Sequence, residues 1–152
     1  MDWKFLFFSL DGRINRAKYW LGSLAVVVMG TAGILLILAM VGISDAAVAF
    51  TIALSLALLY PSYAVMAKRF QDRNKPGVLA LFGIVPLVSS NLLQTFGYLD
   101  PENPSVILQI FDVVVVGISL WLLVELGILK GTQGPNRYGP DPLGVPQEDA
   151  RL

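Results

Sequence analysis

The chain has 152 residues, of which 55% are hydrophobic and 14% are charged, with 11 basic residues balanced by 11 acidic ones. This length suits one domain, and the charged share is about half of that usual in soluble proteins. The absence of cysteine and histidine excludes disulfides, thiolate nucleophiles, imidazole bases and the common haem and zinc ligands. The zero net charge gives no attraction to nucleic acid, so no such partner is expected.

The N-terminal arm, residues 1–18, is rich in aromatic residues and too short to cross a bilayer. Trp3, Phe5, Phe7 and Phe8 lie close together in it. Aromatic side chains are enriched at the depth of the lipid headgroups. The arm therefore predicts a short helix or turn lying in the inner membrane interface.

Four apolar stretches follow the arm, at residues 19–41, 46–67, 78–99 and 106–129. A helix of about 20 apolar residues crosses the hydrocarbon core. We therefore expect an all-α polytopic membrane protein, a bundle of four transmembrane helices that makes residues 1–152 a single membrane domain with a tail at 130–152. The short connections at 42–45 and 100–105 predict two antiparallel helical hairpins.

The basic residues indicate the orientation of this bundle. Cytoplasmic segments of membrane proteins are enriched in Lys and Arg. All eleven basic residues lie in the arm, in the connection after the second stretch or in the tail. The charged residues of the two remaining connections are all acidic. Both termini are therefore expected in the cytoplasm.

Small residues recur in the first two stretches and predict close approach of helix backbones in lipid. They serve either packing inside one chain or contact between copies. They are Gly22, Gly30 and Gly33 in the first stretch and Ala49, Ala53 and Ala57 in the second.

Two carboxylates, Asp112 and Glu125, lie inside the fourth stretch, where charge is costly. They are roughly 20 Å apart along a helix, so they cannot form a catalytic dyad. Glu125 lies about one turn from the cytoplasmic end. We expect it to form an ion pair there, with Arg13, Arg16, Lys18 or Arg69 as candidate partners.

Asp112 lies deeper, toward the outer face, where no basic residue is expected. The antiparallel third stretch brings Ser90, Asn91 and Gln94 to similar depth, so a hydrogen-bonded cluster is one reading. The alternative is a site for a proton or a small cation in transport.

Three polar motifs carry a resemblance to a known family. The stretch from Phe8 to Arg16, followed by Tyr19 and Trp20, resembles an F-x-G-R-x-x-R-x-x-[YF]-W opening. Lys68 to Arg73 resembles an A-x-R-[LF]-H-D loop. Glycines and prolines are expected to end the fourth helix at Lys130, and Gly134 to Pro142 beyond it resembles G-x-N-[RK]-[YF]-G-x-D-P. Together they are similar to the YhaH-like bacterial inner-membrane family, domain of unknown function 805. Gln71 stands where the family usually has His. The resemblance implies a class and a bacterial inner-membrane location rather than a mechanism.

The topology places all three motifs on the cytoplasmic side, where their polar residues are expected to converge. The resulting cluster is either a set of salt bridges that ties arm, loop and tail together, or a site for an anionic lipid headgroup or a partner protein. Its expected members are Arg13, Arg16, Arg69, Asp72, Asn136, Arg137 and Asp141.

We therefore expect a non-enzymatic accessory or scaffold subunit without cofactor or metal, which binds membrane lipids or other membrane proteins and could form a homo-oligomer or join a larger complex. The alternative is a small oligomeric ion or solute transporter or channel that uses Asp112. An interfacial enzyme acting on lipid is a third reading, but the sequence offers no obvious nucleophile–base pair.

Overall fold

The computed structural model describes residues 2–95 and 105–144, and for residues 87, 90–92, 94 and 95 it describes the backbone only. These residues form helices, and no strand occurs in the described ranges. The elements are α1 (Trp3–Phe8), α2 (Arg16–Val41), α3 (Asp45–Asp72), the 3-10 helix η1 (Gly77–Ala80), α4 (Leu81–Thr95), α5 (Val106–Leu122) and the π-helix η2 (Leu123–Ile128).

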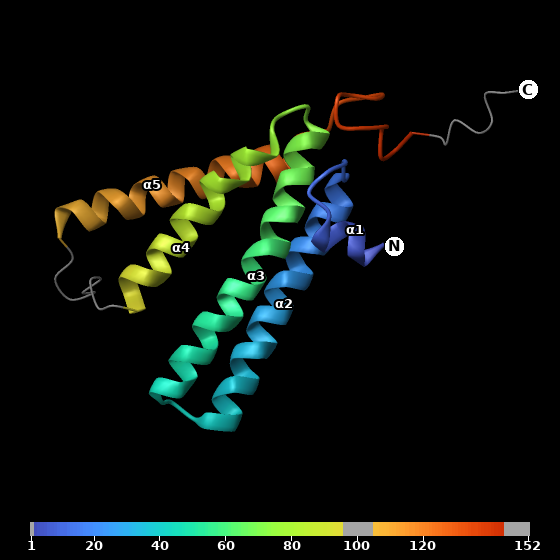
Figure 1. Cartoon of the computed structure of the whole chain (residues 1–152). Helices are drawn as coiled ribbons and strands as arrows, with labels where there is room; N and C mark the ends of the chain where they lie inside the picture. Colours follow the sequence, from blue (N-terminus) through green and yellow to red (C-terminus); the bar gives the residue numbers. More distant parts are fainter. Residues whose placement is uncertain (1, 96–104, 145–152) are drawn as a thin grey trace, which may run out of the picture.

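Helices α2 and α3 form a long antiparallel hairpin (Figure 1). Each begins with a side-chain cap: Asn15 accepts from the Lys18 N–H at 2.9 Å, and Ser44 accepts from the Ala47 N–H at 3.3 Å. With 26 and 28 residues, both are long enough and apolar enough to cross a bilayer.

Packing of α2 on α3 uses the small residues of the first predicted stretch. A Cβ added to Gly33 would lie 2.6 Å from the side chain of Leu54, and one on Gly30 would lie 3.3 Å from Leu58. The three alanines on α3 are exposed instead. The predicted packing inside the chain therefore holds for these glycines, and the alanine face is left uncovered in the single chain.

Helices α4 and α5 form the second pair. Val106–Ile128, which joins α5 and η2, is the third helix long and apolar enough to span a membrane. The predicted third stretch, 78–99, falls on η1 and α4, and residues 96–99 lie outside the described ranges. The structure thus confirms an all-helical chain with three candidate spans, while the fourth stays a prediction.

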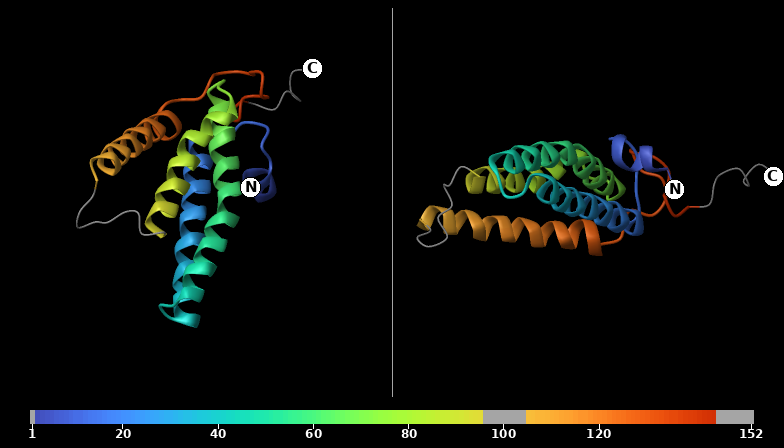
Figure 2. Two further views of the ribbon diagram at one scale, coloured as in Figure 1. Left: turned by 60° about the vertical axis from the view of Figure 1, so that its left-hand side comes forward. Right: turned by 90° about the horizontal axis from the view of Figure 1, so that it is seen from below.

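The two hairpins meet at one end, which we call the polar end because the arm, the end of α3 and the tail gather there (Figure 1). Across the described residues, the backbone of α5 lies close to α4 and η2 but not to α2 or α3. Side chains of α5 reach α3 at the polar end, where the ring centroids of Phe70 and Trp121 lie 5.8 Å apart. Figure 1 and the left view of Figure 2 show α5 diverging from the α2–α3 hairpin away from that end. The helices are therefore splayed rather than closed along their whole length.

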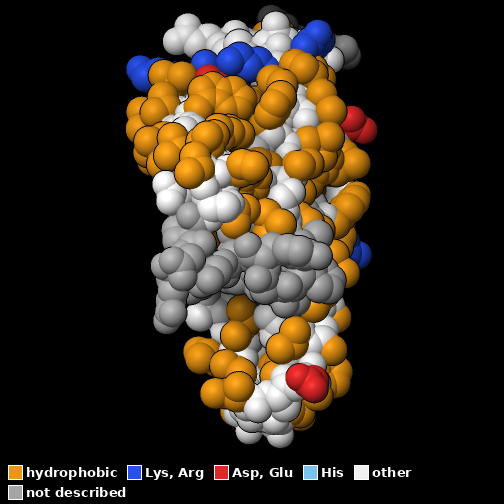
Figure 3. All heavy atoms as spheres, turned by 90° about the vertical axis from the view of Figure 1, so that its left-hand side faces the viewer, with side chains coloured by type: hydrophobic (Ala, Val, Ile, Leu, Met, Phe, Trp, Pro, Cys, Tyr) orange, Lys and Arg blue, Asp and Glu red, His pale blue; other side chains and the backbone are white. Residues whose placement is uncertain are grey.

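The buried core is concentrated at the polar end. Phe70, Ala80 and Leu126 belong to one buried cluster, and Leu6 and Ile14 belong to a second one under the arm. Away from the polar end many large hydrophobic side chains are exposed. On the face shown in Figure 3 they cover much of the described surface below a band of basic side chains. Such a surface requires a nonpolar surrounding, as a bilayer provides.

Candidate functional site at the polar end

A buried triad of Arg13, Asp72 and Arg69 lies at the centre of the polar end. Arg13 Nε donates to Asp72 Oδ1 at 3.1 Å, and Arg69 pairs with the other oxygen, Oδ2. All three side chains are at most 3% exposed. Two guanidinium groups therefore share one carboxylate in a site removed from water.

The remaining donors of Arg13 bind the tail. They reach the carbonyl oxygens of Thr132 at 2.6 Å, Gly134 at 2.7 Å and Gly139 at 3.2 Å. Hydrogen bonds from a charged group to buried carbonyls are among the stronger ones in proteins. One side chain from the arm thus fixes the path of the tail.

The remaining donors of Arg69 bind the end of the last helix. Nε donates to the carbonyl of Leu126 at 2.8 Å and one terminal nitrogen donates to Leu129 at 2.6 Å. The last carbonyls of a helix have no partner within the helix, so Arg69 caps η2 from another element. The fourth predicted helix therefore ends at Ile128, two residues before the expected Lys130.

The tail folds back on itself and on α3. Asn136 Nδ2 donates to the Gln71 carbonyl and to Thr132 Oγ1, each at 2.9 Å, and Thr132 donates in turn to the Asp72 carbonyl. Asp141 accepts backbone N–H groups of Leu143 and Gly134, both at 2.9 Å. These hydrogen bonds lower the pKa of the Asp141 carboxyl, because they stabilise its charged form.

Two predicted members of the cluster, Arg16 and Arg137, lie at its edge. Arg16 donates to the Ile128 carbonyl at 3.0 Å, and Arg137 donates to the Asn74 carbonyl at 3.2 Å while stacking on Tyr138. Both side chains are exposed. The structure thus brings the seven predicted residues to one end of the molecule, but it buries only three of them.

The structure corrects the ion-pair partners predicted for Glu125. Glu125 is buried near the polar end, as expected, but its oxygen pairs with Arg73 at 2.6 Å and Lys75 at 2.7 Å. None of the four expected cations pairs with it in the described residues. Arg13 and Arg69 are bound to Asp72, and Arg16 donates to the Ile128 carbonyl. The turn after α3 supplies its partners instead.

Sequence reasoning missed the role of Lys68, which is fully buried. Its ammonium donates to the carbonyls of Phe5 at 2.6 Å, Leu6 at 2.8 Å and Ser9 at 2.5 Å, at the end of α1. This docks the arm, whose predicted short helix is α1, onto α3. The available signal was the position of a lysine directly after an apolar stretch, opposite an apolar arm.

The motif around Gln71 is helical rather than a loop, since α3 continues to Asp72. The Gln71 side chain donates to the Leu10 carbonyl at 2.9 Å, and its own oxygen is buried without a hydrogen bond among the described residues. A glutamine at this position therefore holds the arm as an uncharged donor.

Of the predicted intramembrane polar residues, Asp112 is exposed on α5 and makes no hydrogen bond within the described part of the chain. The side chains of Ser90, Asn91 and Gln94 lie outside the described residues, so their cluster with Asp112 stays a prediction. No group of three potential metal ligands occurs in the described ranges.

This geometry defines a helical membrane protein whose arm, α3 and tail are locked together by buried arginines. The model of the family described as protein of unknown function DUF805 matches residues 7–140, and the chain belongs to this family. It is similar to the uncharacterized protein YiiR of Escherichia coli strain K12 and of Escherichia coli O157:H7. Each is 29% identical over 136 residues, which cover 88% of this chain and 86% of the relative. No solved structure matches the chain.

Proposed function

We propose that the chain is a non-enzymatic accessory or scaffold protein of the bacterial inner membrane, which spans it four times and binds lipid or other membrane proteins. The single observation that carries this proposal is the saturation of the polar end. Every guanidinium nitrogen of Arg13 and Arg69 already donates a hydrogen bond within the chain. Groups held in this way maintain a shape rather than transfer protons or attack a substrate.

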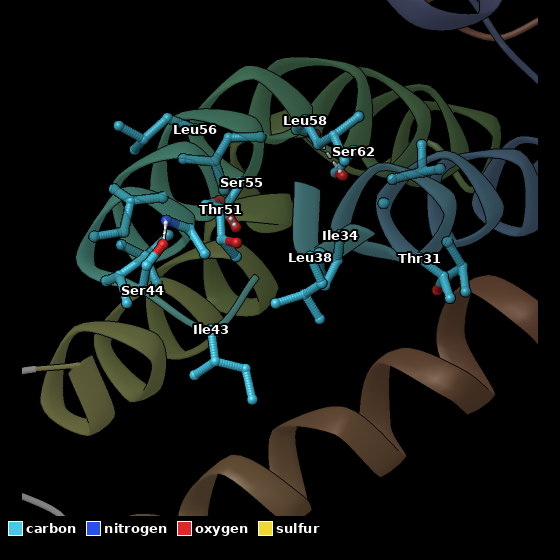
Figure 4. A pocket seen from close by; sticks show the side chains of 18 residues that line it. Thr31, Ile34, Leu38, Ile43, Ser44, Thr51, Ser55, Leu56, Leu58 and Ser62 are labelled. Carbon is cyan, nitrogen blue, oxygen red and sulfur yellow. Dashed lines mark hydrogen bonds between the residues drawn. The ribbon is translucent and has the colours of Figure 1, made fainter. Parts of the chain in front are cut away.

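The surface available to a partner is the lateral surface, formed by the sides of the long helices. A cavity of about 660 Å³ lies along α2 and α3 (Figure 4), and Val88 of α4 also lines it. Its lining is mostly apolar, and the hydroxyls of Ser55 and Ser62 are bound to carbonyls of their own helix at 2.8 and 2.7 Å. This lining fits an acyl chain or an apolar helix better than a polar solute.

The lateral surface is tested by photo-crosslinking in intact membranes. A photo-reactive residue at Ile34, which lines the cavity, is expected to give discrete adducts with one lipid class or one membrane protein. The matched control is its neighbour Leu35, which is 63% exposed and does not line the cavity. Identical products from both positions would contradict the proposal, because they would indicate bulk lipid only.

Both termini are placed in the cytoplasm by the same proposal. The chain has no cysteine, so one introduced cysteine is a unique probe. A cysteine at Ile43, which is 99% exposed between α2 and α3, is expected to react with an impermeant maleimide in intact cells. One at Gln133 in the tail is expected to react only after permeabilisation. The reverse pattern would overturn the layout.

A second candidate function, a small oligomeric ion or solute transporter or channel, is favoured by the exposure of Asp112 on α5. A carboxylate on a membrane helix requires water or a polar partner. Ion flux into liposomes that contain the purified protein tests this candidate directly.

A further inference from the structure

A second cavity lies at the polar end, between the start of α2 and the tail, and has a volume of about 340 Å³. Arg16 and Lys130 line it, together with Arg69 and Asp72 of the buried triad and with Asp141. It is separate from the apolar cavity, which shares no lining residue with it.

The charges around this cavity are unbalanced. The triad keeps one positive charge because Asp72 pairs with two arginines. Two backbone hydrogen bonds and the nearby charge of Arg13 lower the pKa of the Asp141 carboxyl, so its negative charge offsets that of the triad. Arg16 and Lys130 then add two positive charges that no carboxylate pairs with among the described residues, and a bound anion would neutralise them.

The two remaining cations of the lining have donors to spare. Arg16 makes one hydrogen bond, to the Ile128 carbonyl, and the Lys130 ammonium makes none among the described residues. Both side chains are exposed, so they can turn toward a ligand. Guanidinium and ammonium groups that flank an open cavity are the usual partners of phosphate oxygens.

The position of the cavity indicates where such an anion comes from. Trp20, one turn into α2, is 48% exposed and donates from its indole nitrogen to the Gly127 carbonyl at 3.2 Å. Half-exposed tryptophans of this kind lie at the depth of lipid headgroups. Arg16 precedes Trp20 by one turn, on the side away from the hydrocarbon core, which is the level of the phospholipid phosphates.

We propose that this cavity binds a phosphate group, either of an anionic phospholipid in the adjacent leaflet or of a free phosphate ion, between Arg16 and Lys130. This inference rests on the proposed membrane function and names one ligand of it. The two fail separately, because the Ile34 crosslink reports on the lateral surface and the variants below leave that surface unchanged.

The test uses the full-length protein in detergent and measures the phosphatidylglycerol retained in native mass spectra. We expect the double variant Arg16→Gln/Lys130→Gln to reduce retention about fivefold for each cation removed. The matched control is Arg137→Gln, which removes an exposed cation of the polar end that does not line the cavity. Equal losses in the control and the double variant, or no loss in either, would overturn the site.

A third variant guards against loss of the fold. Gln133→Glu adds a negative charge to an exposed residue of the cavity lining and removes no hydrogen bond within the described residues. It is expected to weaken phosphatidylglycerol retention while the melting temperature stays unchanged. Full retention in this variant would contradict the proposal.

The source of the phosphate is separated by competition. Inorganic phosphate is added at constant ionic strength, with chloride as the control salt. If it displaces phosphatidylglycerol and raises the melting temperature of the wild type but not of the double variant, the ligand is the phosphate ion. If inorganic phosphate has no such effect and only phosphatidylglycerol raises the melting temperature of the wild type, the ligand is a lipid headgroup. If neither binds in a way that depends on Arg16 and Lys130, the site is wrong.

Discussion

The polar end and the opposite half of the helices, where α5 diverges from the α2–α3 hairpin and which we call the splayed half, are stabilised in different ways. At the polar end, charged side chains are buried and bound to carbonyls that lie more than 50 residues away in sequence. In the splayed half, apolar side chains are exposed and the backbone of α5 is not close to α2 or α3 among the described residues. The comparison teaches that a membrane chain can confine its specific interactions to one end and leave the rest to lipid.

The largest expected effect is that of Asp72→Ala, because it leaves Arg13 and Arg69 buried without their carboxylate. Removing one partner of a buried ion pair costs about 3–5 kcal/mol. We expect this loss in the free energy of unfolding, measured by denaturant titration in mixed micelles.

Arg137→Ala is the control for Asp72→Ala. Its side chain is exposed, so its stability is expected to stay within about 0.5 kcal/mol of the wild type. Equal stability of the two variants would remove the contrast between a specific polar end and a loose remainder.

The next effect is that of Lys68→Met, which keeps the length of the side chain but leaves three carbonyls of the arm without their donor. An unsatisfied buried polar group costs about 1–3 kcal/mol. We expect α1 to detach from α3 while the helices stay folded, measured as faster hydrogen exchange of the α1 amides. Lys4→Met, at an exposed position of α1, serves as the control, and the same acceleration in both would refute the docking role.

The third prediction concerns the splayed half, where packing on α3 depends on small residues rather than charge. Gly33→Val introduces atoms that clash with Leu54 and is expected to destabilise the α2–α3 hairpin by about 1–3 kcal/mol. Gly117→Val on α5, where nothing lies within 4 Å, should leave stability unchanged. Thermal unfolding in detergent compares the two variants. If Gly33→Val is as stable as the wild type, the α2–α3 hairpin does not depend on close packing at this contact.

The sequence predicts the long helices because length and apolar content suffice to recognise α2, α3 and the joined α5–η2. It does not predict that α3 runs on to Asp72. The polar residues of its last turn are kept helical by partners from the arm and the tail, and these contacts depend on the path of the whole chain. The splay is equally invisible, because helices that are apolar on all sides do not reveal which face packs.

The part of the site that the sequence could predict is the gathering of oppositely charged side chains. That Arg13, Arg69 and Asp72 gather at one end follows from the polar motifs placed on one side of a membrane. Their pairing does not follow, because both arginines were equally plausible partners of Glu125. The roles of Lys68 and Thr132 do not follow either, because these side chains bind backbone carbonyls, which every residue has and no motif marks. Glu125 shows the same limit, since four cations lay at a plausible depth and the turn after α3 provided two others.

The smallest expected effect is that of Asp112→Asn in the splayed half. An amide has the shape of the carboxylic acid and reproduces the donor and acceptor of its neutral form. If the splayed half holds no functional charge, the variant folds normally, and vesicles containing it match the wild type in both proton and sodium flux. The control is Ser119→Ala, two turns later on α5, which removes an exposed hydroxyl that is bound to the Val115 carbonyl of its own helix. If the wild type carries a flux that Asp112→Asn abolishes and Ser119→Ala keeps, α5 works through its carboxylate, and the transporter hypothesis replaces the scaffold.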